Sequence, residues 1–221
     1  MGLRELKKEQ TRQLIADTAW RLFSNRGFDQ VTVAEIAREA QVAEATVFNY
    51  FASKEDLFYW PLEAFGARLV ETVGARPPGE SAIAAFRRAL LADGGLLAEA
   101  EGGAAQAAQR LRTVNRVIAG SPALRAREQQ ASNRTAEALA AVLAADGGVP
   151  ESDPIPLVVA NALMGAQRAL LEYARRRVLS GADLTGLAAE VRQLTAAAFA
   201  LLEYGLRDYE VRPAAHSELP E

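Results

Sequence analysis

The chain contains no cysteine and only one histidine among its 221 residues. Without cysteine it can form neither disulfide bonds nor thiolate metal sites, and a reducing compartment is compatible with this composition. The one histidine, His216, lies near the end of the sequence, where we expect a frayed tail. The glycine pairs sit between predicted helices and lack the strand-loop-helix context of a phosphate-binding loop. We therefore expect no enzyme, no cofactor and no metal ion.

Long apolar runs are also lacking. Residues 1–10 carry charged side chains and no apolar segment, so we expect no signal peptide. The longest apolar stretch, 155–166, is interrupted by Asn161 and is too short to span a bilayer. Half of all residues are nevertheless hydrophobic, enough for a sizeable core. These features predict a soluble, cytoplasmic protein with no membrane partner.

Strand-forming residues and excess positive charge are scarce as well. Alanine, leucine, glutamate and arginine dominate, while aromatic residues make up 7% of the chain, and this composition favours an all-α fold. The formal net charge of −3 argues against a protein that coats DNA without specificity, but not against one that binds a specific sequence. The one dense basic cluster comprises Arg4, Lys7, Lys8 and Arg12. It is either a solvated helix end or a contact to DNA phosphates or the minor groove.

Glycine, proline and capping residues divide the chain into helices. A first helix is expected over 5–26, ended by Gly27. Thr32 and Glu35 have the spacing of a capping box and begin a second helix. A short third helix is expected over 44–51, and Ser53 caps a fourth over 54–76. Further helices are expected at 81–92, 104–119, 122–145, 154–179 and 184–207.

The second and third helices are joined by a turn at 41–43, which is the spacing of a helix-turn-helix. Two helices joined by such a short turn also occur in ordinary helical bundles, but the identities of the residues support a helix-turn-helix. From Thr11 to Phe58 the chain resembles the DNA-binding domain of the tetracycline-repressor (TetR) family. The matching segments are Arg12–Ile15, Ala19 with Leu22–Phe23, Arg26–Phe28, Thr32–Ala37, Val42–Phe51 and Ser53–Leu57. The resemblance implies a dimeric transcriptional regulator that binds operator DNA.

Three residues depart from the family pattern. Gln41 stands in the turn where glycine is common, and Ala43 stands where serine is common. Alanine has no side-chain cap to offer the third helix, which costs roughly 1 kcal/mol of local stability. Phe48 stands where the family usually has tyrosine, so one hydroxyl contact to a phosphate is missing. These departures weaken individual contacts without changing the expected fold.

The third helix is the expected recognition helix, lying in the major groove. Val42, Val47 and Phe51 are spaced to anchor it on the first two helices. The DNA-binding candidates are Thr32, Glu44, Ala45, Thr46, Phe48, Asn49, Tyr50 and Lys54.

Each of these candidates has an expected contact. Asn49 can read adenine, Glu44 can accept from cytosine N4, and the methyl group of Ala45 can touch that of thymine. The resemblance implies that Thr46, Tyr50 and Lys54 hold phosphates, while Thr32 offers a hydroxyl and amides to another. Simpler roles remain open: Thr32 as a cap only, Glu44 as a charge that suits the helix N-terminus, and Tyr50 as packing.

We expect residues 1–56 to form the DNA-binding domain, with helix 54–76 as the connection. Residues 57–210 would then form a ligand-binding and dimerisation domain, followed by a frayed tail over 211–221. The last two long helices are apolar on nearly all faces, which suggests burial inside the subunit and against a partner. By resemblance these helices form the dimer interface, with Leu170, Tyr173, Ala197, Ala198 and Leu201 as candidates.

The segment 161–168, followed by Arg175–Arg177, resembles family members whose ligand domain takes an acyl-CoA-like molecule. The candidates for the pocket are Phe65, Phe86, Leu90, Asn161, Met164 and Arg168. The apolar members of this set are equally compatible with plain core packing. Asn161 would alternatively bond a neighbouring helix, and Arg175–Arg177 would form a solvated helix end.

Pro61 lies within the fourth helix, where a proline removes an amide donor and predicts a kink. The kink is either a hinge between the domains or the way the chain turns over its core. The function predicted from these features is a ligand-responsive repressor, released from a palindromic operator by a small apolar or amphipathic effector. The alternative is a ligand-independent helix-turn-helix protein with an architectural or adaptor role.

Overall fold

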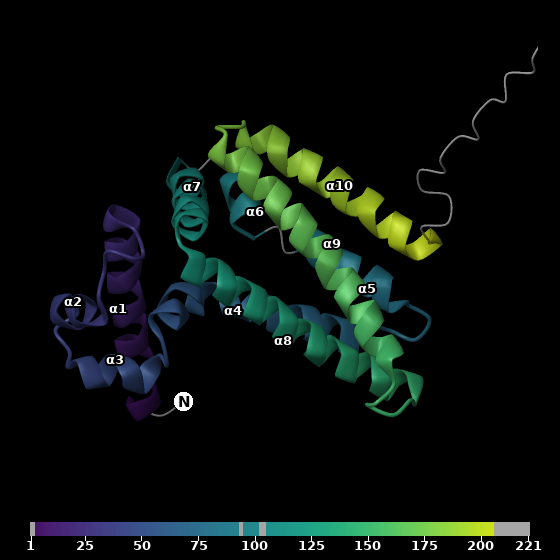
Figure 1. The fold of residues 1–221 in the computed structure, drawn as a ribbon, viewed down its shortest axis with the longest axis horizontal. Helices are drawn as coiled ribbons and strands as arrows, with labels where there is room; N and C mark the ends of the chain where they lie inside the picture. The colour runs from purple at the N-terminus through teal and green to yellow at the C-terminus, as the bar shows by residue number, and fades with distance from the viewer. Residues whose placement is uncertain (1–2, 93–94, 102–104, 206–221) are drawn as a thin grey trace, which may run out of the picture.

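The computed structural model describes residues 3–92, 95–101 and 105–205, and all regular structure in these ranges is α-helical. A small domain of three helices stands at one end, and helix α4 leads from it into a larger bundle (Figure 1). The helices are α1 (Leu3–Arg26), α2 (Val33–Glu39), α3 (Glu44–Tyr50), α4 (Lys54–Gly74), α5 (Ala82–Ala92), α6 (Gly95–Glu101), α7 (Ala105–Gly120), α8 (Pro122–Gly147), α9 (Pro154–Leu179) and α10 (Leu184–Tyr204). The expectation of an all-α fold is confirmed.

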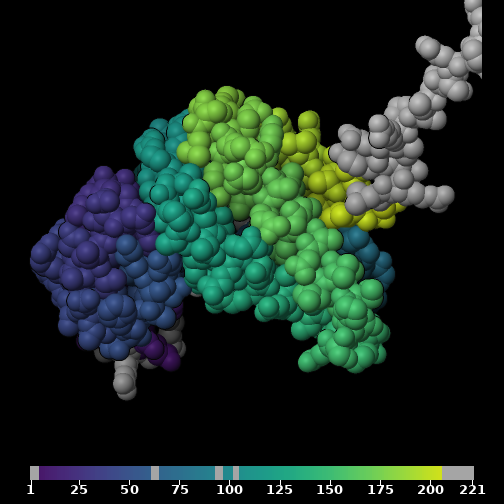
Figure 2. Space-filling view, viewed as in Figure 1, coloured from purple at the N-terminus to yellow at the C-terminus, as the bar shows by residue number. Residues whose placement is uncertain are grey.

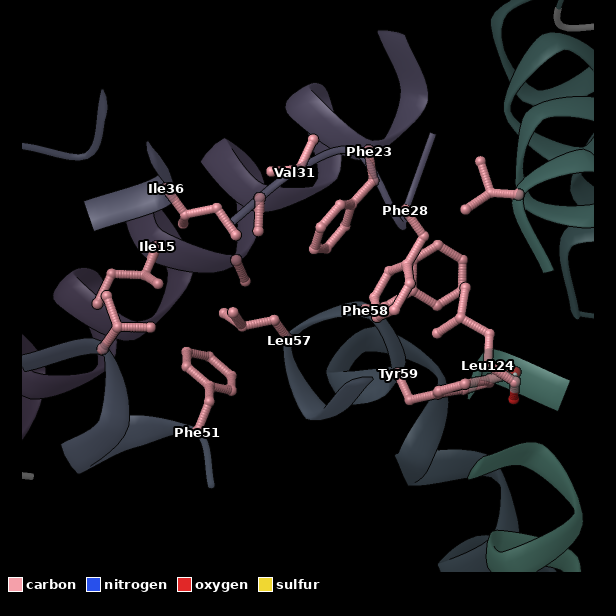
Figure 3. Close-up of a cluster of buried hydrophobic side chains, with 14 of the residues drawn as sticks. Ile15, Phe23, Phe28, Val31, Ile36, Phe51, Leu57, Phe58, Tyr59 and Leu124 are labelled. Atoms are coloured by element: carbon pink, nitrogen blue, oxygen red, sulfur yellow. Dashed lines mark hydrogen bonds between the residues drawn. The ribbon is translucent and has the colours of Figure 1, made fainter. Parts of the chain in front are cut away.

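The core of the small domain extends beyond the expected boundary at residue 56. Leu57, Phe58 and Tyr59 of α4 belong to the same buried cluster as Ile15, Phe23, Ile36 and Phe51, as Figure 3 shows. Residues of the larger domain also join this cluster, namely Val114, Val117 and Ile118 of α7 and Leu124 of α8. The two domains therefore share one continuous apolar contact.

A second core lies inside the larger bundle and draws on α4, α5, α8, α9 and α10. Phe86 of α5 stacks on Phe199 of α10 with ring centroids 5.6 Å apart. Helices α4 and α8 approach closely where Gly66 faces Thr135, because a Cβ at Gly66 would lie 2.7 Å from the hydroxyl oxygen of Thr135. The connecting helix is thus packed at one end on the small domain and at the other on the bundle.

The structure corrects several expected element boundaries. No helix was expected between 92 and 104, yet 95–101 forms the short helix α6. Helix α4 ends at Gly74, two residues before the expected limit, and α8 continues to Gly147. Helix α4 is helical through Pro61, but the side chains of 61–64 lie outside the described residues, as does the tail from 206. The hinge therefore stays a prediction.

Helix α9 contains the apolar stretch 155–166 and extends beyond it on both sides. By length and composition alone it is long and apolar enough, although such a helix is weak evidence for a span. In this fold α9 packs against α8, α10 and α7. Only 22% of its most apolar window is buried within the protomer, so an apolar face remains uncovered.

The turn between α2 and α3 places Gln41 in the left-handed region, with φ of 55°. The amide of Val42 donates to the carbonyl of Ala37, and the amide of Gln41 donates to that of Arg38. This pair of bonds is a Schellman motif, whose left-handed position favours glycine. Gln41, which stands where the family commonly has glycine, therefore occupies the position of the turn where any side chain strains the backbone.

Replacing Gln41 by glycine should raise the free energy of unfolding by up to about 1 kcal/mol, because the left-handed cost of a side chain is removed. Thermal denaturation at fixed protomer concentration would measure this. Gln30 is a matched control: it is also exposed in a turn, and Gln41 is the one non-glycine residue of the described chain with positive φ. Gln30→Gly should lower stability, and a loss of stability in Gln41→Gly would contradict the strain.

Candidate nucleic-acid interface

Helix α3 presents one face to solvent. Glu44, Ala45, Phe48 and Asn49 are exposed, at spacings that place them on the same side of the helix. Thr46 and Tyr50 lie at the edges of this face. The exposed face therefore carries an amide, a methyl group, a carboxylate and an aromatic ring, all of which can meet base edges in a major groove.

The opposite face of α3 anchors the helix, as expected. Val47 and Phe51 are buried in the core of the small domain, and Val42 packs against it. Tyr50 also packs against this core, which is the simpler of the two roles considered for it. Ala43 provides no side-chain hydrogen bond at the start of α3, as its missing hydroxyl predicts. The recognition helix is therefore held by apolar contacts rather than by capping.

The capping box at the start of α2 is formed. The Thr32 hydroxyl accepts from the amide of Glu35, and the amide of Thr32 donates to the Glu35 carboxylate at 2.8 Å. That backbone hydrogen bond, with those from Arg26 and the Thr32 hydroxyl, lowers the pKa of Glu35 to about 2. Thr32 is exposed, so capping and a phosphate contact are compatible at this position.

Lys54 is occupied within the protein. Its ammonium group donates to the carbonyl oxygens of Phe28 and Val31, each at 3.1 Å, and lies 4.2 Å from the centroid of the Phe28 ring. An ammonium group has three donors, so at most one remains for a phosphate. The geometry gives Lys54 the role of tying the α1–α2 turn to the start of α4.

Arg12 is likewise placed against the protein. Its guanidinium carbon lies 5.4 Å from the ring centroid of Phe51 and 5.3 Å from that of Trp60. This contact sets the first half of α1 beside the end of α3. Lys7 and Lys8 lie one turn earlier on α1 and are exposed. Their side chains are open to solvent, while the side chain of Arg4 lies outside the described residues.

Ion pairs neutralise two acids of the small domain. Arg21 pairs with Glu39 at 2.6 Å, and Arg26 pairs with Glu35 at 2.9 Å. Each pair occupies one arginine as well as one acid, so the net charge of the domain is unchanged. On α3 itself Glu44 is the one acidic residue.

Polar contacts join this site to the bundle. Arg127 of α8 pairs with Asp56 at the start of α4, and the Ser121 hydroxyl donates to Asp29 of the small domain, both at 2.9 Å. The Tyr59 hydroxyl donates to the carbonyl of Leu124, and burial raises the pKa of Tyr59. Movement of α8 would therefore displace groups at both ends of the helix-turn-helix.

Arg175 corrects the expectation of a solvated cluster at the end of α9. It is buried, and it bonds Asn115 of α7 at 3.4 Å and Glu128 of α8 at 2.6 Å. Arg177 pairs with Glu190 and also donates to the hydroxyl of Tyr173. Arg176 remains exposed. The first and last of the three arginines thus hold helices together.

The expected pocket residues separate into two groups. Phe65, Phe86, Leu90 and Met164 come together in the core of the bundle. Asn161 and Arg168 do not join them. Asn161 donates to the carbonyl of Leu157 on its own helix, and Arg168 donates to the side chain of Gln129. The structure therefore does not bring the two polar candidates together with the four apolar ones.

Of the residues expected at the dimer interface, some are exposed and others pack inside the bundle. Ala197 and Leu201 of α10 are exposed, as a dimer interface requires. Leu170 and Ala198 pack against the core of the bundle, and Tyr173 donates a hydrogen bond to Glu190. Further exposed apolar residues, absent from the expected interface, are Ile155, Leu157 and Val158 of α9, together with Leu194 and Tyr204 of α10.

Sequence models of two protein families match the chain. That of the bacterial regulatory proteins of the tetR family matches residues 15–59, which contain the helix-turn-helix. That of the MftR C-terminal domain matches residues 80–207, which cover most of the bundle. Together they account for both domains of the fold.

Individual proteins are similar over both domains. The transcriptional regulator TcmR of Streptomyces glaucescens is 30% identical over 69% of this chain and 67% of its own length. The putative mycofactocin biosynthesis regulator MftR of Mycobacterium tuberculosis is 31% identical over 76% of this chain and 81% of its own. Among solved structures, a complex of SmeT with triclosan has a TM-score of 0.53 at 20% identity, covering 86% of this chain and 91% of that one.

Proposed function

The chain belongs to the tetR family of DNA-binding transcriptional regulators, and we propose that it is a repressor released from a near-palindromic operator by a small molecule. The observation that carries this proposal is the exposed face of α3, with Asn49 and Ala45 directed outward and Val47 beneath them in the core. A homodimer would present two such faces, and the two-fold symmetry of the protein would match that of the operator.

The dimer would form through α9 and α10. Val158, Ala162 and Ala169 of α9 are exposed along one side of the helix, and Gly165 lies between them with open space where a Cβ would stand. Ala197 and Leu201 of α10 are exposed in the same way. Small residues allow a close approach of helices, and apolar ones gain from burial. These two helices lie next to each other along one side of the bundle in Figures 1 and 2.

The effector we propose is apolar or amphipathic and binds within the bundle. Phe65, Leu90 and Met164 supply apolar surface there, and SmeT, which shares this fold, forms a complex with triclosan. An acyl-CoA-like molecule is the finer proposal, supported by the resemblance of 161–168 and by this apolar lining. Since Asn161 and Arg168 bond elsewhere, a polar headgroup would need partners other than those two side chains.

The effector would act through the contacts between the domains. Arg175 links α9 to Glu128 of α8, and α8 in turn holds Asp56 and Tyr59 of α4. A ligand shifts an equilibrium only if it binds one arrangement more tightly than the other. We propose that the effector favours an arrangement of α4 and α8 in which the paired recognition helices no longer match the spacing of the operator.

Operator selection from random DNA, followed by affinity measurements on Asn49→Ala, tests this function. The selected sequences should be near-palindromic, with half-sites about 34–36 Å or a multiple of that distance apart. Asn49→Ala should lose about 1–3 kcal/mol of discrimination at one base pair of each half-site and leave the affinity for random DNA unchanged.

Lys8→Ala is the matched control, because Lys8 is exposed on α1 and would meet only phosphate. It should weaken binding to all sequences and flatten the salt dependence by about one unit for each phosphate that the protein no longer neutralises. If Asn49→Ala lowers the affinity for operator and random DNA equally, Asn49 does not read a base. If selection enriches no sequence at all, the chain is not an operator-binding repressor.

A further inference from the structure

A half-open groove of about 490 Å³ lies between α1 and α7. One wall belongs to the small domain and the other to the bundle, and Figure 1 shows α7 beside the later part of α1. The groove includes Trp20 and Ser24 of α1, whereas α1 meets the end of α3 earlier, at Arg12. It is therefore set apart from the surface that would face DNA.

Polar side chains line this groove together with Ala16 and Trp20. Gln13, Asp17 and Asn25 line it from α1, and Gln109, Arg110 and Arg116 line it from α7. The apolar side of α7 is used elsewhere, since Val114, Val117 and Ile118 join the core of the small domain. Two helices that meet in a protein interior usually bring apolar residues together. Helices α1 and α7 bring apolar residues together on the side that faces the core of the small domain. On the side of the groove, polar residues of the two helices face each other.

Several of these polar groups lack a protein partner. The Ser24 hydroxyl is buried and has no hydrogen-bond partner within the described residues. Arg110 lies over the Trp20 ring, 5.8 Å from its centroid. Over the described ranges neither Arg110 nor Arg116, both exposed at this groove, forms an ion pair. A buried hydroxyl without a partner costs free energy, and guanidinium groups beside a concave surface are suited to carboxylates and phosphates.

The charges have opposite signs on the two walls. Asp17 of α1 accepts a hydrogen bond from Gln13 at 2.9 Å, and the arginines stand across from it on α7. Within the described residues, no ion pair joins Asp17 to either arginine. A molecule that spans the groove could satisfy both walls, with an anionic group at the arginines and donor groups at Asp17 and Ser24.

We propose that this groove binds a small polar acid that also carries hydroxyl or amino groups. Its volume lies within the range of about 300–1,000 Å³ that is usual for ligand sites. Such a molecule differs in chemistry from the apolar effector of the bundle. By bridging α1 and α7 it would favour the present arrangement of the two domains. That effect on DNA affinity rests on the proposed function, whereas the binding itself does not.

The binding test uses the full chain without DNA, so its outcome is independent of operator recognition. Quinate, gluconate, citrate and L-glutamate span ring, linear and branched hydroxy acids and an amino acid. Trp20 and Trp60 are the two tryptophans of the chain, so Trp60→Phe leaves Trp20 as the reporter. At least one of these acids should change the Trp20 emission saturably, and calorimetry on the unaltered protein should give the same dissociation constant. If none of them binds, the proposal is overturned.

Variants locate the site. Arg116→Ala should weaken binding at least about tenfold, as expected when a charge-assisted hydrogen bond is removed. Arg134→Ala, an exposed arginine of α8 away from the groove, should leave it unchanged. Ser24→Ala should weaken binding and also raise the melting temperature of the free protein, because it removes the unpartnered hydroxyl. Equal effects of Arg116→Ala and Arg134→Ala would place the acid elsewhere and overturn the proposal.

Discussion

Replacing Phe58 by alanine should lower the free energy of unfolding by about 3–5 kcal/mol, the usual cost of removing a fully buried phenylalanine side chain. Phe58 is 2% exposed and lies among the rings of Trp20, Phe23, Phe28 and Tyr59, with centroids 5.3–6.2 Å apart. Three of these rings belong to the small domain, and Phe58 belongs to the connecting helix. Operator affinity should therefore fall along with stability, because the packing of the helix-turn-helix on α4 is disrupted.

Phe48 is the matched control for this substitution, since it is 50% exposed on the outer face of α3. Phe48→Ala should change stability by no more than about 0.5 kcal/mol, as surface substitutions usually do, and affect DNA binding only. Thermal or urea denaturation at fixed protomer concentration separates the two variants. A similar small decrease in both would mean that Phe58 does not hold α4 to the small domain.

The small domain was predictable because its signals are local. Thr32 and Glu35 are three residues apart, and Gly27 directly follows the helix that it ends, with φ of 84°. Such caps and turns depend on backbone geometry over a few residues. The turn at 41–43 could be predicted from the sequence for the same reason, because it too depends on only a few neighbouring residues. The burial of Val47 and Phe51 then followed from helical spacing.

The roles of the long basic side chains could not be predicted, because their partners lie far along the sequence. Lys54 bonds carbonyls 23 and 26 residues away, and Arg175 bonds Asn115 and Glu128 at 60 and 47 residues. No local pattern distinguishes an arginine buried between helices from one at a solvated helix end. Asn161 was expected to line a pocket or to bond a neighbouring helix, because a polar side chain in an apolar helix needs a partner. Its amide instead donates to a carbonyl one turn back on its own helix.

The change with the largest expected effect on DNA binding lies far from the DNA. Val158 of α9 is 60% exposed and Leu201 of α10 is 41% exposed, so a charge at either position should cost little within the protomer. In a dimer built through these helices, the same charges would be buried without a partner, which is strongly unfavourable. The variant Val158→Glu with Leu201→Glu should therefore keep its helical circular dichroism and become monomeric in light scattering.

Operator affinity of that variant should fall at least about 100-fold, because a monomer loses the effective concentration by which the first bound half-site assists the second. Leu91→Glu supplies the control, since Leu91 is an exposed apolar residue of α5, 38% exposed and outside both helices. It should remain dimeric and bind the operator normally. A double variant that stays dimeric would place the interface on another face. One that becomes monomeric yet binds the operator with unchanged affinity would show that recognition does not require two helices from two protomers.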